Sequence, residues 1–230
     1  MLRLANALLV LMLSATGIAA QFIPIDVDDP RPVEKVIESI EAHCQCVITY
    51  EDPAYRPDQL VDLTRVMRKD DKSGPKILGL PKRFMSFHYD PADNVERNVE
   101  LALQQARGDG LGFRLTRSRD MFHVIPEAGS VLNTQVKGVL KAGTAFDVIR
   151  SILNNVSSTR GLKVGLFGAD QLLRNTRVTL LTDSGSADQM LVGVWPQLAE
   201  QINLSWKLLY EGQQRFYVFN VTAVPKTQQR

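Results

Sequence analysis

The sequence is short of the residues from which reactive centres are commonly built, with two cysteines and three histidines among 230 residues. It contains no Gly-x-Ser-x-Gly motif, the signature of a nucleophile elbow. Ser86 and His88 are two positions apart on one expected strand, but no acidic residue is placed to orient the histidine. The sequence therefore predicts a protein that is not an enzyme and that needs no cofactor.

Net charge is also small. Lysine and arginine together number 27 and aspartate and glutamate 25, which gives a formal net charge of +2. Nucleic-acid binders gain much of their affinity by neutralising phosphates, so this balance argues against a nucleic-acid partner. Because 44% of the residues are hydrophobic, we expect the chain to fold rather than to stay disordered.

Hydrophobic runs long enough to span a bilayer are absent, and the apolar run at the start of the chain is short. Arg3 precedes an apolar segment from Leu4 to Leu13, and small residues follow up to Ala20. Such a segment is too short to span the roughly 30 Å of a bilayer core as a helix. The pattern indicates a secretory signal peptide over residues 1–20. No cysteine stands directly after the cleavage region, so we expect a periplasmic or secreted protein without a lipid anchor.

What the sequence does contain is a pattern that occurs twice. Residues 94–126 combine an apolar helical stripe, a glycine-rich stop, a strand, a polar turn and a second strand, and residues 188–225 repeat this order. The strand 111–115 corresponds to 204–208, and 121–125 corresponds to 216–220. Self-similarity of this kind fixes the architecture before any other feature does, and it predicts two related units.

The spacing of apolar residues predicts the individual elements, with alternation indicating strands and helical spacing indicating helices. Asp93 with Glu96, and Ser186 with Gln189, have the spacing of capping boxes. Pro196 falls inside the last helix, where we expect a kink or a late start. The expected strands are 22–28, 46–50, 84–88, 111–115, 121–125, 135–140, 162–167, 178–182, 204–210 and 216–221, and the helical stripes lie within 33–40, 95–106, 146–156 and 191–202.

These elements predict an α+β fold of two tandem β-α-β-β-α-β-β units. Each helix buries only one face, so the helices are expected to pack between small sheets. The first unit covers residues 21–127 and the second residues 134–224. Residues 56–83 form an insertion in the first unit, with eight basic and four acidic residues. We expect a solvated loop there, because Lys and Arg are mostly exposed; contact of this basic insertion with a membrane is the less favoured alternative.

This order of elements resembles the short N-terminal domain of outer-membrane secretins and TonB-dependent signalling receptors. The resembling stretches are residues 25–55 with 85–126, and 143–173 with 177–221. The resemblance implies β-α-β repeats, a periplasmic location and function through protein–protein contact, without catalytic residues. Since no plug, barrel or pore domain follows, we expect a free-standing tandem version rather than a receptor or a pore.

His43, Cys44 and Cys46 form one cluster of soft metal ligands, which allows three interpretations. A zinc or copper site would need His88 or His123 to complete its ligands. A disulfide between Cys44 and Cys46 is permitted by export, but it needs a turn, because in a strand the Cβ atoms would be about 6–7 Å apart. We favour a third interpretation, in which Cys46 is a buried free cysteine that packs as a small hydrophobic residue.

The function favoured by these observations is binding of an envelope protein, through exposed strand edges or helix faces. A metal-binding or thiol-redox protein that uses His43, Cys44 and Cys46 is the alternative. Trp195 on a helical stripe and Trp206 on a strand are expected in the core rather than at a ligand site.

Overall fold

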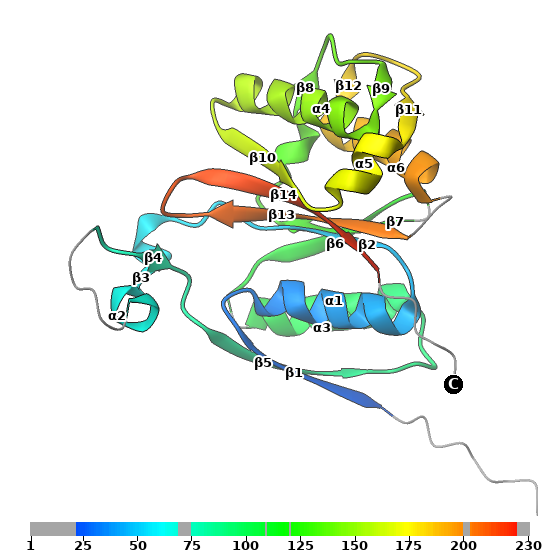
Figure 1. Ribbon diagram of the computed structural model, residues 1–230. Coiled ribbons are helices and arrows are strands. Elements are labelled where there is room, and N and C mark those ends of the chain that lie inside the picture. The colour runs from blue at the N-terminus through cyan, green and yellow to red at the C-terminus, as the bar shows by residue number, and fades with distance from the viewer. Residues whose placement is uncertain (1–21, 69–74, 109, 120, 200–202, 225–230) are drawn as a thin grey trace, which may run out of the picture.

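A six-stranded mixed sheet forms the middle layer of the protein, in a computed structural model that describes residues 22–68, 75–108, 110–119, 121–199 and 203–224. The longer helices lie on both sides of this sheet (Figure 1). They are α1 (Pro32–Cys44) and α3 (Val95–Gly108) on one face, and α4 (Ala145–Arg160) and α6 (Ala187–Ala199) on the other. The fold class is α+β, as predicted. The predicted signal peptide lies outside the described residues.

The central sheet contains three strands from each half of the chain, in the order β10-β14-β13-β2-β7-β6. In the first half β2 runs parallel to β7, and β7 is antiparallel to β6. In the second half β10 runs parallel to β14, and β14 is antiparallel to β13. The strands are β2 (Ile48–Glu51), β6 (Phe113–Ser118), β7 (Met121–Pro126), β10 (Lys163–Phe167), β13 (Leu204–Glu211) and β14 (Phe216–Ala223).

The two halves meet where β13 lies parallel beside β2. At this joint the backbone N–H of Asp52 donates to the carbonyl oxygen of Leu208 at 2.8 Å. A continuous sheet was not expected from the sequence, which predicted separate small sheets. Pairing the two inner edges satisfies backbone groups that would otherwise need other partners, which is the physical reason for the difference.

In the first half, α1 and α3 lie between the central sheet and an outer pair of strands, β1 (Ile23–Asp29) and β5 (Arg83–Tyr89). The N-cap of α3 is Asn94, one residue after the expected Asp93, because Asn94 Oδ1 accepts the N–H of Arg97 at 2.7 Å. The capping box predicted at Asp93 and Glu96 is therefore wrong. The predicted stripe of α1 is buried, with exposures of 0–1% at Val33, Val36, Ile37 and Ile40.

In the second half, α4 and α6 lie between the central sheet and two outer pairs of short strands. These pairs are β9 (Ala142–Thr144) with β11 (Arg177–Thr179), and β8 (Gln135–Val136) with β12 (Gly185–Ser186). Ser186 Oγ accepts the N–H of Gln189 at 3.2 Å, at the predicted start of α6. The expected strands 135–140 and 178–182 are shorter than predicted, and a short helix, α5 (Asp170–Asn175), lies between β10 and β11.

Both tryptophans lie in the core of the second half, as predicted. Trp195 and Trp206 are each 2% exposed, and their ring centroids are 4.3 Å apart. Trp195 Nε1 donates to the carbonyl oxygen of Leu204 at 2.7 Å, so its one polar group is satisfied. Pro196 is accommodated within α6, which continues to Ala199.

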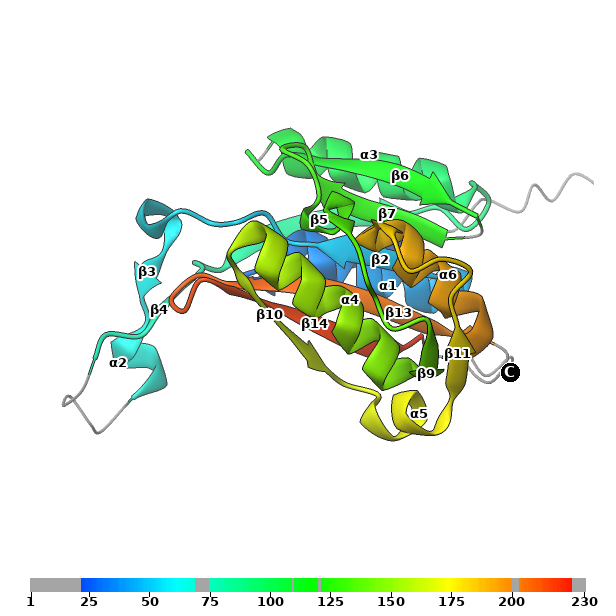
Figure 2. The ribbon, with the colours of Figure 1, turned by 90° about the horizontal axis from the view of Figure 1, so that it is seen from above.

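The insertion projects from one end of the layers in both views (Figures 1 and 2). Its elements are the 3-10 turn η1 (Pro57–Gln59), β3 (Val61–Asp62), the short helix α2 (Thr64–Met67) and β4 (Leu78–Gly79). A second 3-10 turn, η2 (Val131–Asn133), connects the halves. Within the described ranges, we find no helix with the length and apolar character needed to cross a bilayer.

Candidate functional site

Cys44 and Cys46 are joined by a disulfide, with an S–S distance of 1.97 Å and a Cα–Cα distance of 5.2 Å. The helix α1 ends at Cys44, and Gln45 adopts the left-handed conformation with φ of 54°. This turn brings the two sulfurs together before β2 starts at Ile48. The favoured prediction of a free buried cysteine at Cys46 is wrong, because it assumed a strand that already begins at that residue.

The position of this disulfide at the C-terminal end of α1 disfavours thiolate chemistry. The carbonyl end of a helix carries partial negative charge, which would destabilise a thiolate formed at Cys44. Reactive cysteines gain from the opposite arrangement, at a helix N-terminus or beside a cation. The geometry therefore fits a covalent clamp on the turn between α1 and β2 better than a reactive disulfide.

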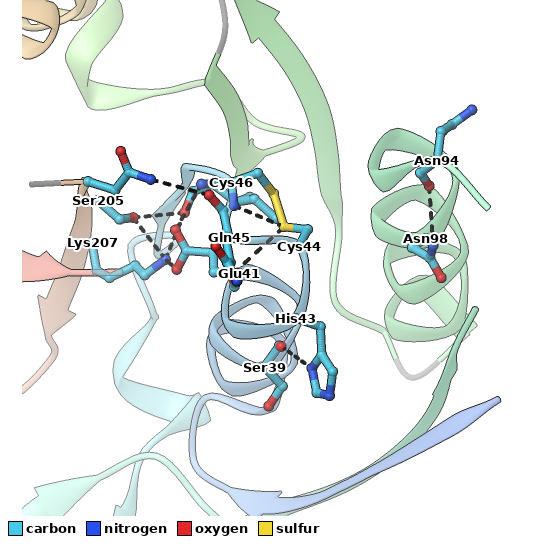
Figure 3. The surroundings of a disulfide bond; sticks show 12 residues. Ser39, Glu41, His43, Cys44, Gln45, Cys46, Asn94, Asn98, Ser205 and Lys207 are labelled. Atoms are coloured by element: carbon cyan, nitrogen blue, oxygen red, sulfur yellow. Dashed lines mark hydrogen bonds and ion pairs between the residues drawn. A yellow bond between two sulfur atoms is a disulfide. The ribbon is translucent and has the colours of Figure 1, made fainter. Parts of the chain in front are cut away.

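A buried ion pair lies beside the clamped turn (Figure 3). Lys207 on β13 is 1% exposed, and its Nζ donates to Glu41 Oε2 at 2.6 Å. The same Nζ donates to the carbonyl oxygen of Ile48 at 2.7 Å and to Ser205 Oγ at 3.2 Å. Glu41 Oε1 in turn accepts the N–H of Ile48 at 2.8 Å. All three protons of the ammonium group are thus used, which is the condition for burying a charge without a large penalty.

A second buried carboxylate, Asp52, also links the two halves. Its Oδ2 accepts from Arg31 Nε at 2.7 Å and from the N–H of Tyr210 at 2.9 Å. Its Oδ1 accepts from the hydroxyls of Tyr50 at 2.8 Å and Tyr55 at 3.1 Å. Burial alone would lower the pKa of Arg31, but the adjacent Asp52 charge and hydrogen bond hold it above its ordinary value.

A third carboxylate, Glu51, holds the segment that connects the halves. It accepts from Ser130 Oγ at 2.5 Å and from the N–H of Val131 at 2.6 Å. Burial raises the pKa of Glu51 to about 7, although both hydrogen bonds act in the opposite direction. Glu41 on α1 and Asp52 after β2 thus bind the second half, and Glu51 at the end of β2 binds the connecting segment.

His123 on β7 is buried at the same interface. Its Nδ1 lies 2.7 Å from Thr49 Oγ1, while its Nε2 has no hydrogen-bond partner among the described residues. Burial lowers the pKa of His123, partly opposed by the charge of Asp188. The ring lies 5.5 Å from that of Trp206, centroid to centroid. The imidazole is thus almost fully buried, at 3% exposure, between Thr49 and Trp206.

The structure does not bring the candidate metal ligands together. His43 is exposed, with its Nδ1 2.7 Å from the carbonyl oxygen of Ser39 and its ring 5.2 Å from that of Tyr89. His88 is exposed on β5, and both sulfurs are held in the disulfide. In the part of the chain that the structure describes, no three His, Cys, Asp or Glu side chains are grouped to hold a metal ion.

An open pocket of about 380 Å³ borders the disulfide between the two halves. Its polar groups are the side chains of Arg119, Asn203 and Gln45. A guanidinium and two amides can bind a ligand, but they supply neither a nucleophile nor a general base at neutral pH. The remaining lining residues are Cys46, Val47, Met121, Trp195 and Pro196.

Sequence reasoning missed the buried charges, although a local signal was present. Glu41 continues the buried face of α1, four residues after Ile37 and next to Ile40. Lys207 lies between Trp206 and Leu208, and Ser205 is the other polar residue of the segment Leu204–Leu209. A charge placed on an otherwise apolar face often has a buried partner, but the sequence does not identify which residue that partner is.

Comparison with protein-family models, with curated proteins and with solved structures finds no match. The contacts of the chain's own residues hold the two halves together and leave sheet edges and the insertion available for contact with other molecules.

Proposed function

We propose that this chain is a non-catalytic periplasmic module that binds or organises envelope proteins, built from two units like the short N-terminal domain of secretins and TonB-dependent receptors. The observation that carries this proposal is the open edge of the central sheet at β10. Support also comes from the matching order of parallel and antiparallel pairs in the two halves.

The outward-facing groups of β10 can be assigned from one hydrogen bond. The N–H of Val164 donates to Ser157 Oγ at 3.1 Å and not to β14. Because backbone groups alternate in direction along a strand, the N–H and C=O of Leu166 face the same way, toward the open edge. A strand from a partner could pair with them, which is a common mode of peptide recognition.

The side chains of β10 favour such pairing. Phe167 is 54% exposed, Gly165 adds no bulk, and Lys163 is the one charged residue in the strand. The other outer strand, β6, carries the exposed cations Arg114 and Arg117. Charged side chains on an edge strand hinder pairing with another chain. β10 is therefore the edge at which we expect the partner.

A second copy of this chain is a poor candidate for that partner. The internal joint between β13 and β2 depends on Glu41, whose carboxylate neutralises Lys207. Burial along α1 and α4 follows the same spacing, and Leu153 on α4 then stands where Glu41 stands on α1. Arg114 on β6 corresponds to Lys207 on β13 in the repeat. If a second copy paired its β6 with β10 in the way that β13 pairs with β2, Arg114 would lie against Leu153, where no carboxylate is present to neutralise it.

Affinity capture from envelope extracts tests this function with a matched pair of variants. Phe167→Lys adds a charge to β10, and Thr116→Lys adds the same charge to β6. We expect one specific protein to be recovered by the wild type and by Thr116→Lys, and to be lost with Phe167→Lys. In the recovered complex, hydrogen exchange at the Leu166 amide should slow. Recovery of no specific protein, or equal recovery by all three baits, would contradict the proposal.

A further inference from the structure

The arm, residues 56–68 and 75–82, is an ordered structure rather than a loose loop. Its strands β3 and β4 are antiparallel, with Val61 opposite Gly79. Thr64 fixes the turn into α2, since its Oγ1 accepts the N–H of Ile77 at 2.9 Å and its own N–H donates to Asp62 Oδ1 at 2.9 Å. The chain therefore specifies the conformation of a segment that has no buried residues in η1, β3 or α2.

The arm is also attached to the body at a defined place. Gln213, in the turn after β13, donates from Nε2 to the carbonyl oxygen of Lys76 at 2.8 Å and accepts the N–H of Leu78 at 3.3 Å. Leu60 packs on Gly212, where a Cβ atom would approach its Cδ1 to 2.9 Å. These contacts hold the root of the arm, and α2 lies away from the helices and sheets of the body in both views (Figures 1 and 2).

The helix α2 exposes adjacent apolar side chains. Val66 is 70% and Met67 67% exposed, and Arg65 beside them is exposed as well. Single exposed apolar residues are ordinary, but two neighbours on a projecting, hydrogen-bonded segment leave apolar surface available for contact. This helix is therefore the part of the arm that is suited to touch another surface.

The charges of the arm indicate the kind of surface. Its described acids are already paired, Asp58 with Arg56 at 3.1 Å and Asp62 with Lys76 at 3.8 Å. The whole segment 56–83 has eight basic and four acidic residues, a formal net charge of +4, although Lys82 at the root of the arm is paired with Asp28 of the body at 3.1 Å. Cations around a small apolar tip complement an anionic lipid surface, where the headgroups attract the charges and the interface takes up the apolar side chains.

We infer that the arm is a membrane-contact device, in which α2 docks on an anionic bilayer surface with Val66 and Met67 at the headgroup boundary. The body then stands off the membrane with its β10 edge free. This contact is independent of strand pairing at β10, so failure of one leaves the other standing.

Binding to lipid vesicles tests this inference with the full mature chain. We expect the protein to co-sediment with phosphatidylglycerol vesicles more than with phosphatidylcholine vesicles, and the difference to shrink at high salt. The double variant Val66→Asp/Met67→Asp should lower partitioning at least about tenfold. The matched control is Leu181→Asp, because Leu181 is 96% exposed but lies in the second half of the chain. Circular dichroism verifies that each variant is folded.

A dye attached at position 67 reports whether α2 itself enters the lipid interface, which a loss of vesicle binding does not show. Met67→Cys labelled with an environment-sensitive dye should shift to shorter wavelength with phosphatidylglycerol vesicles, whereas Leu181→Cys with the same dye should not. No vesicle binding, equal loss in the Leu181→Asp control, or an unshifted dye at position 67 would overturn the inference. Cross-linking of position 67 to an envelope protein without any lipid response would overturn it too, in favour of a protein partner.

Discussion

Lys207 Nζ lies 2.6 Å from Glu41 Oε2, although the two residues are 166 positions apart in the sequence. Lys207 comes from β13 and Glu41 from α1, so this contact joins the second half of the protein to the first. Both side chains are almost fully buried. The joint between the halves thus contains charges that only their mutual contact makes tolerable.

Removing one member of this pair should destabilise the protein strongly. Lys207→Met leaves the Glu41 carboxylate buried without its partner, and we expect a loss of about 3–5 kcal/mol of unfolding free energy. Glu41→Leu together with Lys207→Met should restore much of the loss. Urea denaturation measures both, with Lys82→Met as control, because Lys82 pairs with Asp28 on the surface. Such an exposed pair contributes about 1 kcal/mol or less. Equal costs for Lys207→Met and Lys82→Met would contradict the buried role.

Loss of the disulfide should have a smaller effect. Closing a loop as short as the one between Cys44 and Cys46 restricts the unfolded chain little, so the double variant Cys44→Ala/Cys46→Ala should lose about 1.5 kcal/mol. The variant should still unfold cooperatively in urea. A collapse of tertiary structure, seen in near-ultraviolet circular dichroism, would mean that the clamp organises far more than its own turn.

Stability should fall as pH rises from 4.5 to 7 through the titration of Glu51. Its pKa is raised by burial from 4.5 to about 7 in the folded protein. The folded state therefore holds this proton more tightly than the unfolded state, and the stabilisation present below pH 4.5 is lost as pH approaches 7. A shift of this size corresponds to about 3 kcal/mol as an upper bound.

Comparison with Glu51→Gln isolates this contribution. Glu34, with a pKa also near 7, acts in the same direction, and His123, whose pKa is lowered by burial, acts in the opposite one. Both groups are present in wild type and variant, so the difference between their unfolding free energies should change in one direction between pH 4.5 and 7, with the wild type losing stability relative to the variant. Parallel pH profiles would show that Glu51 is already ionised at pH 5.

The attachment of the arm should depend on a glycine. In Gly212→Val the new side chain would meet Leu60 and push the root of the arm away from the body. Limited trypsin digestion should then cut within residues 56–83 several times faster, while the circular dichroism of the body stays unchanged. Gly108→Val serves as control, since a Cβ atom at Gly108 meets nothing within 4 Å. Equal digestion rates for Gly212→Val and Gly108→Val would show that the contact of Leu60 with Gly212 does not hold the arm to the body.

The positions of the main helices could be predicted because their apolar spacing is a local signal. Val36 and Ile37 mark the buried face of α1, and both are 0% exposed. Errors occurred where one backbone angle decides the outcome. The left-handed conformation of Gln45 turned an expected strand into a disulfide-linked turn, and α3 took Asn94 rather than Asp93 as its cap. Such choices among neighbours differ by small energies that a spacing pattern does not resolve.

By itself, the sequence determined the fold class, the apolar faces of the helices and the burial of Trp195 and Trp206. Only the tertiary structure decided that β13 pairs with β2, and that Glu41 and Lys207 meet within the resulting joint. The reason is physical. Side-chain spacing encodes which face of an element avoids water, whereas the backbone groups of a strand edge are the same for every residue and pair according to which edges the folded chain brings together.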